Sequence, residues 1–213
     1  MKRIPKIKKK FGILIIVWIL IIIYLGALVL QSFMGVEIKK PAIYLYPREK
    51  TNISVLITIN GKITHSEPNY NYGWNIVAEP NGMIDGRYDY LFYEARLRNK
   101  IVQKEGWVVR YSNLEEWFDR KLPQLGLNLK EISQFKDYWL NELPKSNYYE
   151  IKLLSDKFLN DNMNLIIAPK PDTIIRRIFY FKPTQSKTTL VEPQIYSERK
   201  GFTVVEWGGF IDK

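Results

Sequence analysis

The chain has 213 residues, with 32 Lys and Arg against 22 Asp and Glu, one His and no Cys. This length suits one domain with an appendage, because domains of about 100–150 residues are the commonest. A chain without Cys has no disulfide scaffold, thiol nucleophile or Cys-ligated zinc, and the single His65 excludes a site that needs two imidazoles. Its 46% hydrophobic and 25% charged residues are ordinary for a globular protein.

The net charge of +10 is concentrated at the N-terminus. Six Lys and Arg lie within the first ten residues, and no acidic residue occurs before Glu37. The remaining chain has 26 basic and 22 acidic residues, a mild excess that is typical of a soluble domain. We therefore expect no nucleic-acid partner.

Residues 11–34, from Phe11 to Met34, are predicted to form a transmembrane anchor. Residues 11–30 are almost wholly apolar, and twenty residues at a helical rise of about 1.5 Å span roughly 30 Å, the thickness of a bilayer core. By the positive-inside rule, the preceding cations place residues 1–10 in the cytoplasm. We expect a single-pass protein of the cell membrane whose partner is the lipid bilayer, with a stalk at 35–40 and an extracytoplasmic domain at 41–213.

A cleaved secretory signal is the alternative interpretation of this segment. Signal cores run about 7–15 residues and end in a small-x-small cleavage site. The apolar run here is longer, and residues 26–29 (GALV) offer no such site, so the pattern favours an uncleaved anchor. A lipoprotein signal is excluded because there is no Cys to acylate. No ionisable residue lies inside the span, which indicates an anchor rather than a transport element.

The first half of the outer domain is predicted to be β-structure. Residues 53–60 alternate between β-branched and mostly polar positions, which predicts a strand with Ile53, Val55, Ile57 and Ile59 on one face. Asn60-Gly61 then predicts a type I′ hairpin, with residues 62–65 returning antiparallel to that strand. Further strands are predicted over 74–78, 88–97 and 106–111.

Two helices are predicted to follow these strands. The first covers residues 114–122, is capped by Ser112 or Asn113 and is limited by Pro123. The second begins after Asn128, which can form a capping box with Glu131, and ends before Pro144. Their apolar faces are predicted to be core and comprise Leu114, Trp117, Phe118 and Leu122 in the first and Ile132, Phe135, Trp139 and Leu143 in the second.

The last part of the chain is predicted to return to strands, at 148–154, 164–168, 173–181 and 202–207. Strands, a helical pair and strands again predict an α+β fold, a mainly antiparallel β domain with an inserted pair of helices. Residues 182–201 show no period, and we expect them to wrap the surface.

Several phrases along residues 40–209 resemble one bacterial protein family. They are KPAIYLYP at 40–47, PNYNYGW at 68–74, AEPNG at 78–82, YLFYE at 90–94, LGLN at 125–128, YWL at 138–140, KPDTIIR at 170–176 and KGFTVVEWGG at 200–209. The chain resembles an envelope family of unknown function with a KPxIYLYP opening and a GFTVVEWGG close. Where that family has Trp-Glu-Gly, this chain has Tyr93-Glu94-Ala95, which favours a packing role for this position. The resemblance implies a single domain with a definite fold and implies no activity.

Aromatic side chains around Gly73 are the candidate binding site. Tyr70, Tyr72 and Trp74 crowd a predicted turn, where side chains tend to be exposed. Exposed Tyr and Trp faces stack on sugars and anchor interfaces, so these three residues are candidates for contact with a glycan or a protein. Packing within the domain is an equally weighted alternative.

Two acidic residues are the candidate catalytic groups. Glu94 and Glu206 lie in recognisable phrases beside aromatic or apolar residues, and a glycosidase needs two carboxylates about 5–10 Å apart. For Glu206 we favour a different role, a buried structural bridge to Arg176 or Arg177, because acids and Arg both occur within apolar strands here.

The sequence carries no motif for a cofactor or a metal ion. It lacks a P-loop, G-x-G-x-x-G, H-E-x-x-H and G-x-S-x-G. The loose Asn and Asp group at 156–164 is more typical of turns than of a calcium site, and His65 is expected to be exposed.

Taken together, the sequence favours a membrane-anchored extracytoplasmic binding or interaction module of the cell envelope, with a glycan or protein ligand. The alternative is a carboxylate-dependent hydrolase of cell-envelope polysaccharide. A scaffold subunit of a membrane complex is a third interpretation.

Overall fold

The computed structural model describes residues 16–24, 26, 35–100 and 102–212. The chain divides into two compact units, Met1–Gly35 and Val36–Lys213. In the first unit residues 16–24 are helical. Most of the predicted anchor, Phe11 to Met34, lies outside the described residues, and none of the helices that are described is long and apolar enough to cross a membrane.

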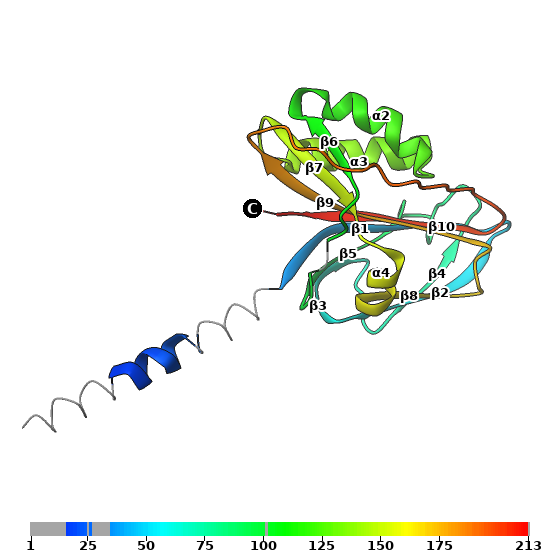
Figure 1. Cartoon of the computed structure of the whole chain (residues 1–213). Coiled ribbons are helices and arrows are strands. Elements are labelled where there is room, and N and C mark those ends of the chain that lie inside the picture. The colour runs from blue at the N-terminus through cyan, green and yellow to red at the C-terminus, as the bar shows by residue number, and fades with distance from the viewer. Residues whose placement is uncertain (1–15, 25, 27–34, 101, 213) are drawn as a thin grey trace, which may run out of the picture. The chain divides into compact units, whose positions relative to one another are not determined.

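The second unit contains two β-sheets and three α-helices within the described range (Figure 1). The larger sheet has the strand order β3 (Gly61–Glu67), β5 (Leu91–Leu97), β1 (Val36–Tyr46), β10 (Thr203–Ile211), β9 (Thr173–Thr184), β7 (Tyr148–Leu153) and β6 (Trp107–Arg110). The smaller sheet has the order β4 (Trp74–Ala78), β2 (Thr51–Ile59) and β8 (Met163–Ala168). The helices are α2 (Leu114–Gln124), which follows a 3₁₀ turn at Tyr111–Asn113, α3 (Leu129–Glu142) and α4 (Asp156–Asn162).

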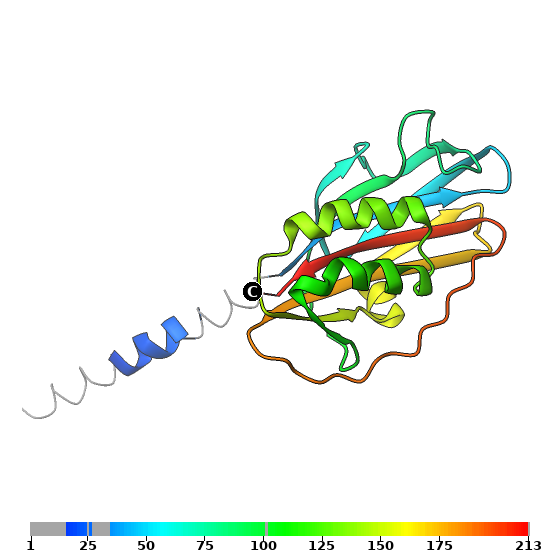
Figure 2. The ribbon, with the colours of Figure 1, turned by 90° about the horizontal axis from the view of Figure 1, so that it is seen from above.

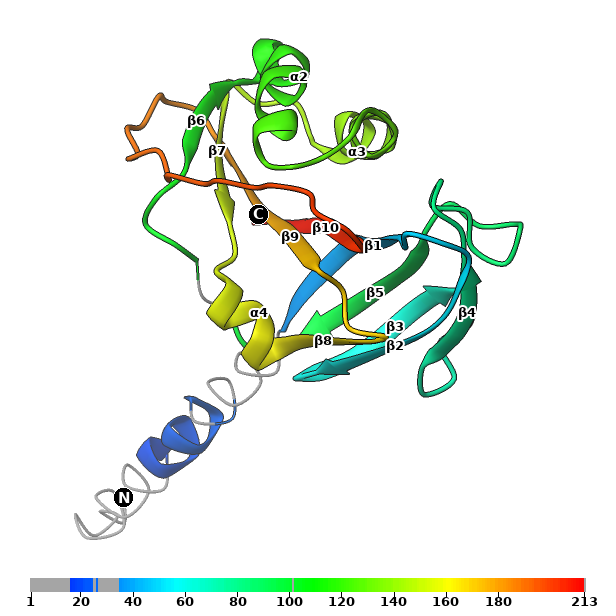
Figure 3. The ribbon, with the colours of Figure 1, turned by 90° about the vertical axis from the view of Figure 1, so that its right-hand side faces the viewer.

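The large sheet is packed on both faces (Figure 3). One core lies between it and the small sheet and includes Phe158 and Leu159 of α4. The other core lies under α2 and α3 and contains Trp117, Phe135 and Trp139. Of the strand pairs in the described sheets only β9 with β10 is parallel, so the predicted α+β class with mainly antiparallel strands is confirmed.

The predicted helical pair is also confirmed. In α3 the Asn128 side chain accepts from the backbone N of Glu131, and the Glu131 side chain accepts from the backbone N of Asn128. In α2 the helix continues through Pro123 to Gln124, slightly beyond its predicted end. All the apolar positions predicted to face the core in both helices are buried.

The hairpin predicted at Asn60-Gly61 is wrong. The chain does turn there, but β2 pairs with β4 and β8, whereas β3 pairs with β5 in the other sheet. A Cβ added to Gly61 would lie 2.0 Å from the carbonyl oxygen of Arg96. Glycine is therefore required by close approach of the crossing chain to β5, not by a two-residue hairpin.

Other segments also differ from the sequence-based expectation. The stalk predicted at 35–40 is wrong, because Val36 to Lys40 belong to β1 and Ile38 is buried against β5. The Asn and Asp group at 156–164 was interpreted as typical of turns, but it contains the helix α4, which starts after the cap Ser155. Residues 185–202 have no regular structure and run along the outer side of α2 and β9 before β10 (Figure 2). We call residues 185–202 the strap.

Candidate functional site

The aromatic turn is mostly structural. Trp74 is only 3% exposed, and its Nε1 donates to the carbonyl of Pro68 at 2.8 Å. The Tyr70 hydroxyl donates to the carbonyl of Ile57 at 2.9 Å and accepts from its backbone N at 2.7 Å. The two rings pack edge to face with centroids 4.8 Å apart. The exposure expected for Trp74 is therefore wrong, whereas Tyr72 is 96% exposed.

Glu206 forms the buried bridge that the sequence favoured. It is 0% exposed; its Oε2 accepts from Arg176 Nε at 2.6 Å, and its Oε1 accepts from the Tyr93 hydroxyl at 2.7 Å. Burial has the largest single effect on the pKa of Arg176 and lowers it, but the charge and hydrogen bond of Glu206, together with the charges of Tyr93 and Asp156, outweigh burial and leave that pKa above its ordinary value. Burial, followed by the charge of Glu206, raises the pKa of Tyr93 well above its ordinary range. Both carboxylate oxygens are therefore occupied inside the protein.

Glu94 lies on the opposite face of the large sheet from Glu206. Tyr93 reaches Glu206 through the core between the two sheets, and successive side chains of a strand point to opposite faces. Glu94 therefore points toward the side that carries α2 and α3. Two carboxylates separated by a packed sheet do not flank one glycosidic bond, so the predicted catalytic pairing of Glu94 with Glu206 is wrong.

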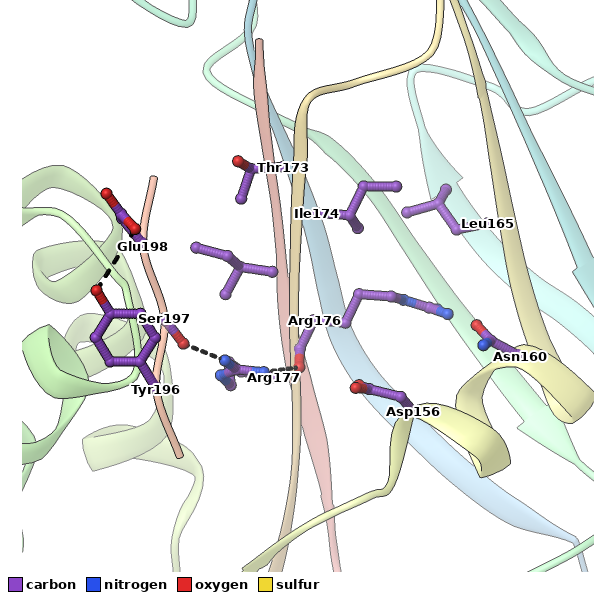
Figure 4. A pocket seen from close by; sticks show the side chains of 11 residues that line it. Asp156, Asn160, Leu165, Thr173, Ile174, Arg176, Arg177, Tyr196, Ser197 and Glu198 are labelled. Carbon is purple, nitrogen blue, oxygen red and sulfur yellow. Dashed lines mark hydrogen bonds between the residues drawn. The ribbon is translucent and has the colours of Figure 1, made fainter. Parts of the chain in front are cut away.

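A groove runs along one edge of β9 and contains none of the site residues predicted from the sequence. It consists of two adjoining cavities of about 400 Å³ each, which share Asp156, Arg176, Arg177 and Tyr196. Figure 4 shows Arg176 pointing toward Asn160 and Arg177 pointing toward Ser197. One wall is formed by α4 and Leu165 of β8, and the other by residues 193–198 of the strap.

The strap is fixed on both sides of the part that lines the groove. Before it, the carbonyl of Val191 accepts from Gly106 N at 2.9 Å, and Glu192 Oε2 accepts from Trp107 Nε1 at 3.0 Å. After it, Arg199 makes a bidentate ion pair with Glu131, a fully buried carboxylate, with a closest approach of 2.9 Å. The strap therefore forms a defined wall.

Arg177 is the unusual charge in this groove. Its Nε donates to Leu125 O at 3.0 Å, its Nη1 to Arg176 O at 2.8 Å, and its Nη2 to Ser197 Oγ. No carboxylate of the described residues lies within salt-bridge distance of it. Burial lowers its pKa, and the nearby Asp156 offsets this only in part. A guanidinium held in place without a counter-ion is prepared to receive a carboxylate or a carbonyl oxygen.

The groove has the attributes of a binding site more than those of a reaction centre. Its acidic residue Asp156 is exposed and, within the described structure, is in no salt bridge, while Arg176 has a buried Nη1 with no hydrogen-bond partner there. No group of three or more His, Cys, Asp or Glu in the described part of the chain is arranged to hold a metal ion. Fixed donors without a nucleophile beside a base support recognition of a ligand.

The chain matches no family model, no curated protein and no solved structure. The likeness to the KPxIYLYP family therefore stays an inference from motifs.

Releasing the strap is expected to destabilise the domain. In Arg199→Gln the buried Glu131 loses its ion pair, so we expect the free energy of unfolding to fall by about 2–3 kcal/mol. Chemical denaturation measures this loss, and cleavage by a Glu-specific protease after Glu198 should accelerate. The adjacent Lys200→Gln is the control, because its pair with Glu198 is largely exposed and its loss should cost no more than about 0.5 kcal/mol. Equal stabilities of the two variants would contradict the role of Arg199.

Proposed function

We propose that this protein is a single-pass anchored module of the cell envelope whose outer domain, Val36–Lys213, binds a ligand in the β9 groove. The basic N-terminal segment and the long apolar run support the anchor and its orientation. The groove supports a binding role, and the observation that carries this proposal is Arg177, a partly buried guanidinium between the two walls that has no ion pair with any residue the structure describes. We do not retain the alternative function, a polysaccharide hydrolase, because its two candidate carboxylates, Glu94 and Glu206, lie on opposite faces of the sheet.

The proposed topology can be tested with single cysteines, since the chain has none of its own. Tyr72→Cys places a thiol at a fully exposed turn of the outer domain, and Lys9→Cys places one in the basic segment. We expect a membrane-impermeant maleimide to label the Tyr72→Cys chain in intact cells and the Lys9→Cys chain only after lysis. Labelling of Lys9→Cys in intact cells, or a mature chain that lacks residue 9, would contradict the anchor.

Occupancy of the groove can be tested with the same chemistry. Tyr196 is 86% exposed beside the groove, so Tyr196→Cys and Tyr72→Cys should react at similar rates in the isolated domain 36–213, which forms a compact unit with its own cores. In envelope membranes we expect the Tyr196→Cys thiol to react several-fold more slowly, because a bound ligand covers it. The Tyr72→Cys thiol should react as it does in the isolated domain. Unchanged reactivity of both thiols would overturn binding in this groove.

A further inference from the structure

The floor of the groove is an unpaired strand edge. Along Thr173–Arg177, β9 pairs with β10 on one side, whereas the chain at the end of β7 joins β9 on the other side only from Ile178 onward, where Leu154 N donates to the Ile178 carbonyl. The opposite edge of this stretch therefore has no strand beside it in the described structure. At about 3.3 Å per residue the open stretch is roughly 13–17 Å long, enough for a short extended segment.

The hydrogen bonds at either end show which backbone groups face the groove. Thr173 N donates to Phe202 O, toward β10, at 3.1 Å. The carbonyl of Ile178 accepts from Leu154 N at 2.9 Å, and the carbonyl of Arg176 accepts from the Arg177 side chain, both away from β10. In a strand, alternate residues present N–H and C=O to the same side. Ile174 therefore presents both backbone groups to the groove, and Arg176 presents its N–H.

This pattern selects the kind of ligand. Backbone donors and acceptors at the two-residue spacing of a strand are matched by another extended backbone, the mode by which peptides add to a sheet edge. A second copy of this domain is a poor fit, because α4 and the strap stand on either side of the edge and leave cavities of about 400 Å³ each. A sheet does not enter a groove of that size, whereas a single extended segment does.

The walls indicate which side chains such a segment carries. Toward α4 the groove presents Ile174, which is about half exposed, and Leu165. Toward the strap it presents the guanidinium of Arg177, which is hydrogen-bonded but has no ion pair within the described part of the chain. Successive side chains of an added strand point to opposite faces, so an apolar residue next to an acidic one is complementary to this groove.

We infer that the ligand of the groove is an extended segment of a partner protein that adds to the open edge of β9 as a further strand, with an apolar side chain on Ile174 and a carboxylate on Arg177. The inference rests on the proposed function, because it names the ligand of the same groove.

The first test needs no ligand and is amide exchange in the isolated domain. We expect the amides of Ile174 and Arg176 to exchange much faster than those of Ile175 and Arg177, whose N–H groups face β10. Slow exchange at all four amides would mean that the edge is already closed, and this would overturn the inference.

The second test uses a phage-displayed library of random 12-residue peptides selected on the domain 36–213. We expect enrichment of peptides with adjacent apolar and acidic residues, and protection of the Ile174 and Arg176 amides when such a peptide binds. Ile174→Pro removes an N–H that faces the groove and not β10, a position where proline is tolerated. Ile174→Val retains that N–H and is the matched control.

Peptide binding should weaken about tenfold or more in Ile174→Pro and change less than about threefold in Ile174→Val. Equal binding by the two variants, or a library that yields no binder, would overturn strand addition. If Ile174→Pro does not fold, protection of the Ile174 and Arg176 amides in the wild-type domain decides the question. Two results together would separate this inference from the proposed function. If the Tyr196→Cys thiol is protected in the envelope and the two Ile174 variants bind peptide equally, the groove binds a ligand but not by strand addition.

Discussion

Replacing Glu206 with glutamine is expected to lower the free energy of unfolding of the outer domain by about 3–5 kcal/mol. The guanidinium of Arg176 is 8% exposed and has one carboxylate partner in the described structure. In Glu206→Gln its charge stays in the core, with a neutral amide in place of the carboxylate. The Tyr93 hydroxyl also loses its charged acceptor, because it donates to the same side chain at 2.7 Å. Urea denaturation of residues 36–213 measures the loss.

The double variant Arg176→Met with Glu206→Leu is the informative control. It removes both charges together and fills the space with apolar atoms, so its loss should be smaller than that of Glu206→Gln alone. A single variant that loses less than about 1 kcal/mol would show that Arg176 is not dependent on Glu206. Glu206 is enclosed by the core and has no access to a substrate. We therefore expect Glu206→Gln to lower the stability of the domain and not to remove a catalytic group, as the hydrolase alternative would require.

The elements that the sequence predicted well are those decided by neighbouring residues. The capping box of Asn128 and Glu131 and the apolar stripe of α3 are complete within one short segment, so their spacing alone indicates a helix and its buried face. The alternation of Ile53, Val55 and Ile57 likewise gave the correct buried face of β2. The ion pair of Glu206 could be predicted for a similar reason, because a charge in a buried apolar strand needs a counter-charge.

The predictions that were wrong, and the groove that was not predicted, depend on residues far apart in the sequence. Asn60-Gly61 has the composition of a hairpin, but pairing of β3 with β5 places the next strand in the other sheet. The groove was missed for the same reason. Its parts come from Asp156, Arg176 and Tyr196, and its floor is a backbone edge that carries no residue signature. Two adjacent arginines within the apolar segment 174–179 were the available signal, because they point to opposite faces and Glu206 can neutralise only one of them.

Trp74→Ala is expected to destabilise the domain by about 3–5 kcal/mol, the usual loss when a large buried aromatic side chain is truncated. The indole fills the core between the two sheets, packs on Tyr70 and donates to the carbonyl of Pro68. Its removal leaves a cavity and an unsatisfied carbonyl together. Thermal or urea denaturation of the domain 36–213 would show the loss as a lower midpoint.

Tyr72→Ala separates packing from binding at the same turn. Its ring is exposed to solvent, so the free energy of unfolding should change by no more than about 0.5 kcal/mol. A Trp74→Ala domain as stable as Tyr72→Ala would contradict the buried position of Trp74. If the stabilities differ as expected, loss of ligand binding in Trp74→Ala reports damage to the fold. Tyr72→Ala then becomes the variant that tests for a ligand at this turn, and the β9 groove remains intact in it as an independent site.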